Sequence, residues 1–196
     1  MTFSAFLDAC VLVPSVLRDL LLETGTTPVY RPLWSERIER ETARAISRIH
    51  EARGEDPQES TAYVKRLLRQ MNTALPDARV SGWEALEQQL LTGPDPNDRH
   101  VVAAAVAGRA DVIVTFNLKD FPDEVLPCGL FAQHPDDFLC DLLDLNSLLV
   151  LDSLRTISTR SGRKGPRLTL KDLLDKLERE GLEGFAAEVH GHVPHG

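Results

Sequence analysis

The chain has 196 residues, of which 42% are hydrophobic and 27% are charged, so it is long enough for one domain with a buried core plus a modest appendage. This balance excludes a chain that is disordered throughout. The formal net charge of −8 does not exclude a polyanionic partner, because carboxylates that bind cations add negative charge without repelling phosphate.

The cysteines and the N-terminus indicate a cytoplasmic protein. Cys10, Cys128 and Cys140 form no CxxC pair, and their odd number makes a poor disulfide framework, so we expect a reducing compartment. The apolar N-terminus is interrupted by Asp8 and lacks a basic leading segment, which argues against a signal peptide. No apolar run of about eighteen uncharged residues is present, so no membrane span is expected.

The first part of the chain alternates apolar runs with amphipathic segments. Residues 3–7 form an apolar run that predicts a buried strand ending before Asp8. The elements expected next are a helix from Pro14 to about residue 23, an extended segment over 29–34, a helix from an N-cap at Ser35 to about residue 53, a helix over 60–73, a short edge segment within 76–80, and a helix over 83–91.

The second part predicts the rest of an α/β sandwich and then a helical tail. The elements expected are a loop over 92–97, a helix over 98–107, a strand over 111–116, a further strand within 128–132, one or two helices over 136–160, a loop over 161–166 and two helices over 168–189. The continuous apolar run at 111–116 is typical of a parallel strand covered on both faces. We place a domain over residues 1–134 and a helical C-terminal extension over residues 135–196.

Two acidic residues are expected on helices. Apolar residues recur at helical spacing after Ser35, at Ile38, Ala45, Ile49 and Ala52. This spacing predicts that Glu41 lies on the apolar face, with the arginines of the helix on its other faces, namely Arg37, Arg40, Arg44 and Arg48. Asp98 heads a second helix. The alternatives are that Glu41 lies at the edge of the apolar face and that Asp98 only favours the helix dipole.

Two further acids follow strands. Asp8 ends the first strand, and Asp120 follows the strand over 111–116 after a short turn. Ligands of open parallel sheets bind beyond the carboxyl ends of the strands, so these acids could meet there with Glu41 and Asp98. Carboxylates in one crevice repel one another unless cations neutralise them, and Mg²⁺ or Mn²⁺ is the usual ion for oxygen ligands. The alternative for each acid alone is a solvated surface position.

Other chemistries have less support. The sequence has no glycine-rich phosphate loop. The histidines near the C-terminus, at positions 190, 192 and 195, are more typical of an exposed end than of a zinc site. Cys10 has no assignable base and is expected to be a small buried thiol.

Four ordered motifs resemble the PIN domain. They are Phe6–Ala9, Trp34 to Glu41, Asp95 to Val101, and Ile113 to Asn117 with Asp120–Phe121. The resemblance covers about residues 3–134 and implies a three-layer sandwich, in which helices flank a central parallel sheet. Many bacterial relatives are VapC-like toxins that cleave RNA and are inhibited by a cognate antitoxin.

The resemblance also assigns site residues. It implies that the catalytic and metal-binding acids are Asp8, Glu41, Asp98 and Asp120, with support from Thr115, Asn117 and Ser35. Many relatives have an acid at the position of Asn117, which is why Asp120 is preferred here. The chain departs from the family pattern in three ways. The pair Ala9–Cys10 replaces a polar group, which predicts the loss of a supporting hydrogen bond; the helices over 54–91 are long; and short members lack the extension.

The expected function is therefore a Mg²⁺-dependent (or Mn²⁺-dependent) endoribonuclease, acting as the toxin of a VapBC-type pair. The resemblance implies an RNA substrate, with tRNA favoured by analogy, an antitoxin partner and possible homodimers. Basic residues expected to contact RNA are Arg31, Arg99 and Lys119 near the acids, and Arg160, Arg163 and Lys164 in an acid-free stretch of the tail. The alternative for this stretch is a solvated loop.

Two other functions are considered. One is a catalytically silent PIN-like module that binds RNA or protein, which loss of an acid would have indicated. The other is a phosphatase that uses Asp8 as nucleophile, but such enzymes typically need a second acid two residues later, where Cys10 stands.

Overall fold

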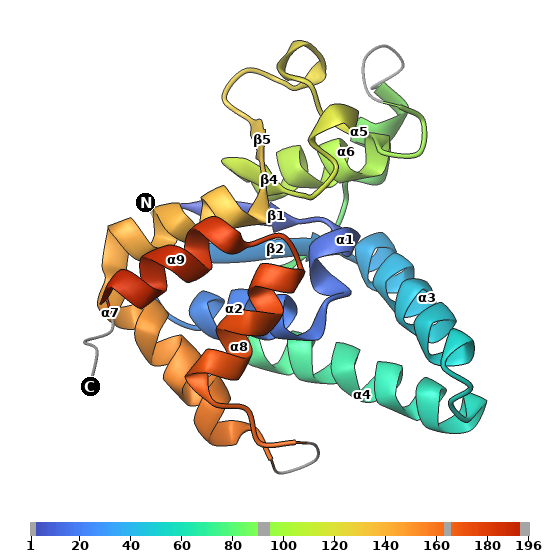
Figure 1. Ribbon diagram of the computed structural model, residues 1–196. Helices are drawn as coiled ribbons and strands as arrows, with labels where there is room; N and C mark the ends of the chain where they lie inside the picture. Colours follow the sequence, from blue (N-terminus) through green and yellow to red (C-terminus); the bar gives the residue numbers. More distant parts are fainter. Residues whose placement is uncertain (1–2, 90–94, 163–165, 193–196) are drawn as a thin grey trace.

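The computed structural model describes residues 3–89, 95–162 and 166–192. Within these ranges, five parallel strands form one sheet in the order β3–β2–β1–β4–β5 (Figure 1). Their bounds are β1 Ser4–Leu7, β2 Arg31–Ser35, β3 Arg79–Val80, β4 Val112–Val114 and β5 Phe131–Gln133. The strands are short, and every residue of β1 and β4 is buried, as expected for strands covered on both faces.

Helices connect the strands. Their bounds are α1 Ala9–Leu12, α2 Ser15–Gly25, α3 Glu36–Ala52, α4 Pro57–Ala74, α5 Glu84–Gln89, α6 Arg99–Gly108, α7 Pro135–Arg160, α8 Leu170–Arg179 and α9 Glu183–His192, with 3₁₀ turns η1 Leu118–Asp120 and η2 Asp123–Val125. The predicted α/β sandwich, with a parallel sheet between helices and a helical C-terminal extension, is confirmed. No helix in the described ranges is both long and apolar enough to cross a bilayer.

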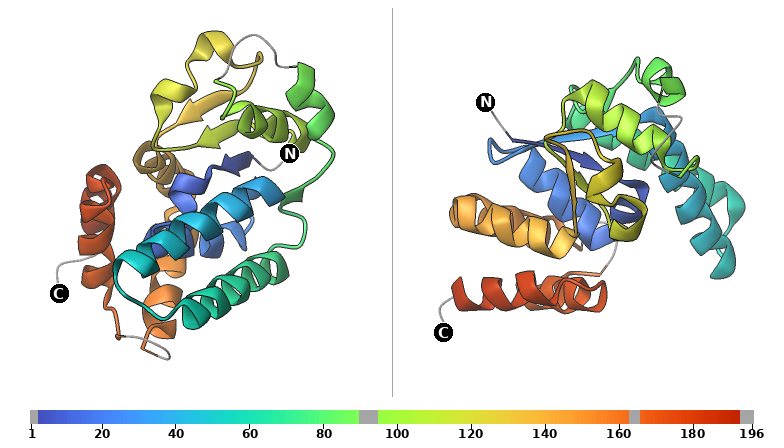
Figure 2. Two further views of the ribbon diagram at one scale, coloured as in Figure 1. Left: turned by 90° about the vertical axis from the view of Figure 1, so that its right-hand side faces the viewer. Right: turned by 90° about the horizontal axis from the view of Figure 1, so that it is seen from above.

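The helices form layers on both faces of the sheet. α6 packs against β1, β2 and β4 on one face, and α2 lies on the other face against β2 (Figures 1 and 2). α7 and α8 pack against α2, and α9 packs against both of them. α3 and α4 form an antiparallel hairpin that extends away from the sheet (Figure 1).

Side chains of the C-terminal helices belong to the same hydrophobic core as the sheet. The ring of Phe138 on α7 meets Tyr30 edge-on at a centroid distance of 5.2 Å and stacks on Phe3 at 6.3 Å. α7 is bent at Asn146, whose backbone is non-helical (φ −158°, ψ 82°) and whose side chain accepts a hydrogen bond from Leu149 N. The domain division at residue 134 stays a prediction.

Some local expectations differ from the structure. Asp8 caps an additional short helix, α1, which the sequence pattern did not predict. α4 begins at Pro57 and not at Ser60, because Asp56 accepts the backbone N–H groups of the first turn and Pro57 suits a first helical position. The expected helix end at residues 90–91 and parts of the loops at 92–97 and 161–166 lie outside the described residues.

Candidate functional site: an acidic edge of the sheet

The strand register places Asp8 and Thr115 side by side at the carboxyl edge of the sheet. β1 and β4 are neighbours, with Leu7 opposite Val114, and Asp8 N donates to Val114 O at 3.1 Å. Each of these two central strands therefore delivers the residue that follows it to the same edge. This is the position expected for a ligand site in a parallel sheet.

The carboxylate of Asp8 is held by three hydrogen bonds and is only 9% exposed. Its Oδ1 accepts Ala9 N at 2.6 Å, and its Oδ2 accepts Thr115 Oγ1 at 2.8 Å and Cys10 Sγ at 3.2 Å. A carboxylate accepts several such donors best when it is ionised. These donors fix the orientation of Asp8 before any ligand binds.

Cys10 supplies a contact that the sequence analysis expected to be missing. Its thiol reaches Asp8 Oδ2 and lies 3.4 Å from Thr115 Oγ1, and it accepts Phe116 N at 3.3 Å. Burial, followed by the negative charge of Asp8, raises the pKa of Cys10 to about 12. The sulfur therefore stays protonated and donates to Asp8. The expectation that Ala9–Cys10 removes a supporting hydrogen bond is wrong, and the thiol that was expected to be buried is half-buried.

Asp98 stands at the N-cap position of α6, but its side chain makes no capping hydrogen bond. Burial raises its pKa, and the negative charges of Asp120 and Asp8 raise it further. Asp95 adds to this effect, and His100 opposes it. The structure thus brings Asp8, Asp98 and Asp120 close enough for Asp98 to feel the charges of the other two.

Glu41 joins this region through contacts with His100 and Arg37. Its Oε1 lies 3.2 Å from His100 Nε2 and 3.2 Å from Arg37 Nε. Burial raises the pKa of Glu41, but hydrogen bonds and charges from His100 and then Arg37 outweigh burial, so the net pKa is lowered. The charge of Glu41 is therefore compensated by its neighbours, whereas the neighbouring acids of Asp98 disfavour its charge.

The placement of Glu41 on the apolar face of α3 is wrong. The buried side of α3 is formed by Ile38, Glu39, Thr42 and Ile46, whereas Ile49 is 37% exposed and Ala52 is exposed. Glu41 is 31% exposed and pairs with Arg37, one turn before it on the same side. The apolar spacing predicted the wrong buried face because two of the buried positions of α3 hold the polar residues Glu39 and Thr42, which a hydrophobic pattern does not include.

The predicted supporting residues have distinct roles. Thr115 Oγ1 donates to Asp8 and accepts Asn117 N at 3.0 Å, so it links the two strand ends. Asn117 takes part through its backbone, since its carbonyl also accepts Asp120 N at 3.0 Å. Ser35 Oγ accepts Ile38 N at 3.3 Å, so it caps α3 and positions Glu41 only through the helix.

The predicted RNA-contacting residues do not all lie at this edge. Arg31 starts β2 opposite Ser4, at the amino edge of the sheet. Arg160 pairs with Glu23 at 2.8 Å, near the end of α2, which also faces the amino edge. Arg99 and Lys119 adjoin the acids Asp98 and Asp120 in the sequence, and Lys119 is exposed. Arg163 and Lys164 lie outside the described residues.

Arg37 is a site neighbour that sequence reasoning missed. Besides Glu41, its guanidinium contacts Glu87 Oε1 at 3.0 Å and Asn97 O at 3.5 Å, so it connects α3 to α5 and to the residue before Asp98. The four-residue spacing of Arg37 and Glu41 was the available signal. The contacts of Arg37 with Glu87 and Asn97 join residues 50 and 60 positions apart in the sequence, so no local sequence pattern predicts them.

The chemistry of the donors at this edge suits a hard divalent cation. Carboxylates are the preferred ligands of Mg²⁺ and Mn²⁺, and Asp98 has an uncapped carboxyl group whose charge is disfavoured by its neighbours. Within residues 3–89, 95–162 and 166–192, however, no three His, Cys, Asp or Glu side chains already form a closed ligand cluster. Mg²⁺ usually keeps several waters and binds through one or two carboxylates, so the donor set fits without a closed cage.

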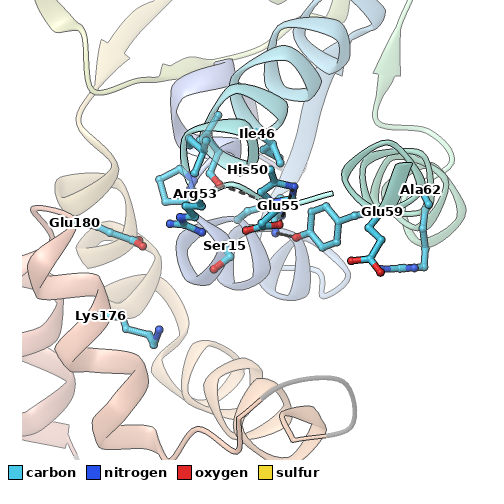
Figure 3. Close-up of a pocket in the computed structure, with 15 residues that line it drawn as sticks. Ser15, Ile46, His50, Arg53, Glu55, Glu59, Ala62, Lys176 and Glu180 are labelled. Atoms are coloured by element: carbon cyan, nitrogen blue, oxygen red, sulfur yellow. Dashed lines mark hydrogen bonds and ion pairs between the residues drawn. The ribbon is translucent and has the colours of Figure 1, made fainter. Parts of the chain in front are cut away.

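A separate groove of about 930 Å³ lies between the start of α2, the α3–α4 hairpin and the end of α8 (Figure 3). None of the four predicted acids lines it. Cationic and acidic side chains alternate in its wall, as Arg53 and Lys176 do with Glu55, Glu59 and Glu180. The groove therefore indicates no single class of ligand and is distinct from the acidic edge.

Comparisons with known proteins assign the family. Residues 4–119 match the family described as PIN domain, and residues 135–191 match the VapC50 C-terminal domain. Over 100 residues the chain is 67% identical to a protein of Mycobacterium tuberculosis (strain ATCC 25618 / H37Rv) named "Putative ribonuclease VapC50". That alignment covers 50% of this chain and 57% of the relative, and no solved structure matches. The chain belongs to the PIN-domain family, as a VapC-like member with a C-terminal extension.

Proposed function

We propose that this protein is a metal-dependent endoribonuclease whose catalytic acids are Asp8, Asp98, Asp120 and Glu41. The observation that carries the proposal is the state of Asp98, whose pKa is raised by burial and by the charges of Asp120 and Asp8 at the carboxyl edge of the sheet. Uncompensated negative charge of this kind is typical of a cation site. The name of the relative supports RNA as the substrate.

The proposed ion is Mg²⁺ or Mn²⁺, held by Asp8, Asp98 and Asp120. When bound, such an ion supplies Lewis acidity, which polarises phosphoryl oxygens and makes water a better nucleophile. Thr115, Cys10 and Ala9 N orient Asp8 with both oxygens accepting, so its ligand geometry is set in advance. Glu41 stays ionised between Arg37 and His100 and can accept a proton at its Oε atoms.

The biological setting follows from the family resemblance and extends the proposal. A VapC-like protein is expected to act as a toxin that an antitoxin inhibits, and the acidic edge is a site that a basic side chain could occupy. The tRNA substrate, the homodimer and the cytoplasmic location stay predictions.

The test is cleavage of total RNA by the purified protein with Mg²⁺, with Mn²⁺ and with EDTA. Wild-type protein should cleave only with the metal, and Asp8→Asn should be inactive. Asp144→Asn is a matched control, because it removes an exposed carboxylate on α7 and should cleave normally. Cleavage that survives both EDTA and Asp8→Asn would contradict the proposal.

A catalytically silent RNA-binding module is the second candidate. The observation in its favour is that the described side chains form no closed metal cluster. Wild-type protein that binds RNA but cleaves none with either metal would support this candidate over the first.

A further inference from the structure

The exposed side of α3 carries arginines that the candidate site does not use. Arg44 and Arg48 are exposed, and neither forms an ion pair with any residue that the structure describes. Their helical neighbours Arg37 and Arg40 are instead paired, with Glu41 and Glu36 respectively. Arg44 and Arg48 therefore offer guanidinium groups to a partner outside the chain.

These two arginines share a helix face with Glu41. They follow Glu41 by three and seven residues, a spacing that stacks side chains along one side of a helix. At a rise of about 1.5 Å per residue, Arg44 lies about 4.5 Å and Arg48 about 10.5 Å beyond Glu41 along the axis. The row formed by Glu41, Arg44 and Arg48 thus begins beside the acidic edge and extends away from it along α3, toward the turn of the α3–α4 hairpin.

We propose that Arg44 and Arg48 bind the phosphates of an RNA strand on one side of the scissile phosphate. The inference rests on the proposed function, because it takes the acidic edge as the point where RNA is cut. The guanidinium groups would hold the strand by charge-assisted hydrogen bonds to phosphate oxygens, without reading its sequence.

Charge distribution favours a polyanion on this face. The chain has a net charge of −8, and the acidic edge itself repels phosphate when no cation is bound. An RNA strand that reaches this edge therefore needs positive charge beside it. Arg44 and Arg48 provide that charge from a regular helix, whereas Arg31 and Arg160 lie at the opposite edge of the sheet.

The experiment measures RNA binding separately from cleavage. Protein carrying Asp8→Asn is titrated against a fluorescently labelled single-stranded RNA, and fluorescence anisotropy gives the affinity between 50 and 200 mM KCl, a range of about fourfold. The test variant adds Arg44→Gln and Arg48→Gln. Losing two phosphate contacts should lower the slope of log affinity against log salt by about 1.4, and should weaken binding at the lowest salt by about tenfold.

Two further variants serve as matched controls. Arg69→Gln with Arg155→Gln makes the same charge change at exposed helical arginines on the amino-edge side, and should leave the slope unchanged. Arg44→Lys with Arg48→Lys keeps the charge and should restore most of the salt dependence. Because all four positions are exposed on helices, circular dichroism should report an unchanged fold.

The outcomes separate this inference from the proposed function. An unchanged salt slope in the Arg44/Arg48 variant, or an equal fall in the Arg69/Arg155 control, overturns the inference even if wild-type protein cleaves RNA. A slope that depends on Arg44 and Arg48 in a protein that cleaves nothing supports phosphate binding by these arginines, but it overturns their place beside a scissile phosphate together with the nuclease proposal. The Arg44→Gln/Arg48→Gln protein is also titrated against polyglutamate. If this variant loses binding to polyglutamate but keeps its binding to RNA, the inference is overturned in favour of an acidic polypeptide as the partner.

Discussion

Two regions of this molecule contain a carboxylate that is at least partly buried, and the neighbours of the two carboxylates differ. In the α3–α4 interface, Glu39 is 6% exposed, and its Oε1 accepts Trp34 Nε1 at 3.0 Å and Asn72 Nδ2 at 2.8 Å. At the sheet edge, Asp98 is less buried, makes no capping hydrogen bond and is surrounded by other acids. Burial alone therefore does not distinguish these two carboxylates, whereas the hydrogen bonds that compensate Glu39 do.

The largest expected effect is at the carboxyl edge of the sheet. Asp8→Asn should lower RNA cleavage by about 10³-fold, because each tenfold step corresponds to about 1.4 kcal/mol and a metal-binding acid supports several kcal/mol of transition-state stabilisation. Initial rates on a defined RNA measure the effect. Unchanged cleavage rates would contradict a catalytic role for Asp8 and would indicate that, like Glu39, it only stabilises the fold.

The compensated acid should show the reverse behaviour. Glu39→Ala removes the acceptor of the Trp34 indole and one of the two acceptors of the Asn72 amide, and should lower the free energy of unfolding by about 2–3 kcal/mol. Urea denaturation measures this loss, and cleavage per folded molecule should remain at the wild-type level. A selective loss of cleavage at full stability would break the contrast between the two regions.

A smaller effect is expected at the residue that orients Asp8. Thr115→Val keeps the shape of the side chain but removes the donor to Asp8 Oδ2, and should weaken metal affinity or activity by about 10–100-fold. Isothermal titration with Mn²⁺ separates affinity from rate. Thr115→Ser keeps the hydroxyl group and is the control that should retain most of the affinity.

The smallest effect concerns stability without metal. A carboxyl group whose pKa is raised in the folded state binds protons more tightly than in the unfolded chain, so its ionised form destabilises the fold above that pKa. Asp98→Asn should therefore raise the Tm of the metal-free protein at neutral pH by a few degrees at most, since 1 kcal/mol corresponds to roughly 2–4 °C for a chain of this size. The gain should shrink as the pH falls through the raised pKa. A lower Tm at neutral pH would show that the charge of Asp98 is compensated after all.

The sequence predicted the elements better than the contacts between them. The apolar runs before Asp8 and Thr115 indicated β1 and β4, because buried parallel strands need continuous hydrophobic residues. The N-cap at Ser35 fixed the start of α3, because capping is a local interaction. The start of α4 and the short helix α1 were not predicted, because Asp56 and Asp8 cap these helices from within segments that lack an apolar periodicity of their own.

The acidic edge was predictable only in part. The positions of Asp8, Asp98 and Asp120 could be predicted because each follows or heads an element whose type was clear, and in the structure Asp98 lies within range of the charges of Asp8 and Asp120. The contact of Glu41 with His100 and that of Arg37 with Glu87 could not be assigned, because His100 and Glu87 approach through the packing of α6 and α5 and not through any local repeat. Ala9–Cys10 was expected to lack a supporting hydrogen bond because it replaces a polar group, yet the thiol of Cys10 donates to Asp8.

Phe138 has a consequence for how this protein can be shortened. Its ring is completely buried between Phe3 and Tyr30, so the tail fills space inside the layer that covers the sheet. A chain truncated before α7 would present those two aromatic rings to solvent and would tend to aggregate. Heating the intact chain should accordingly produce a single calorimetric transition, with both halves melting together.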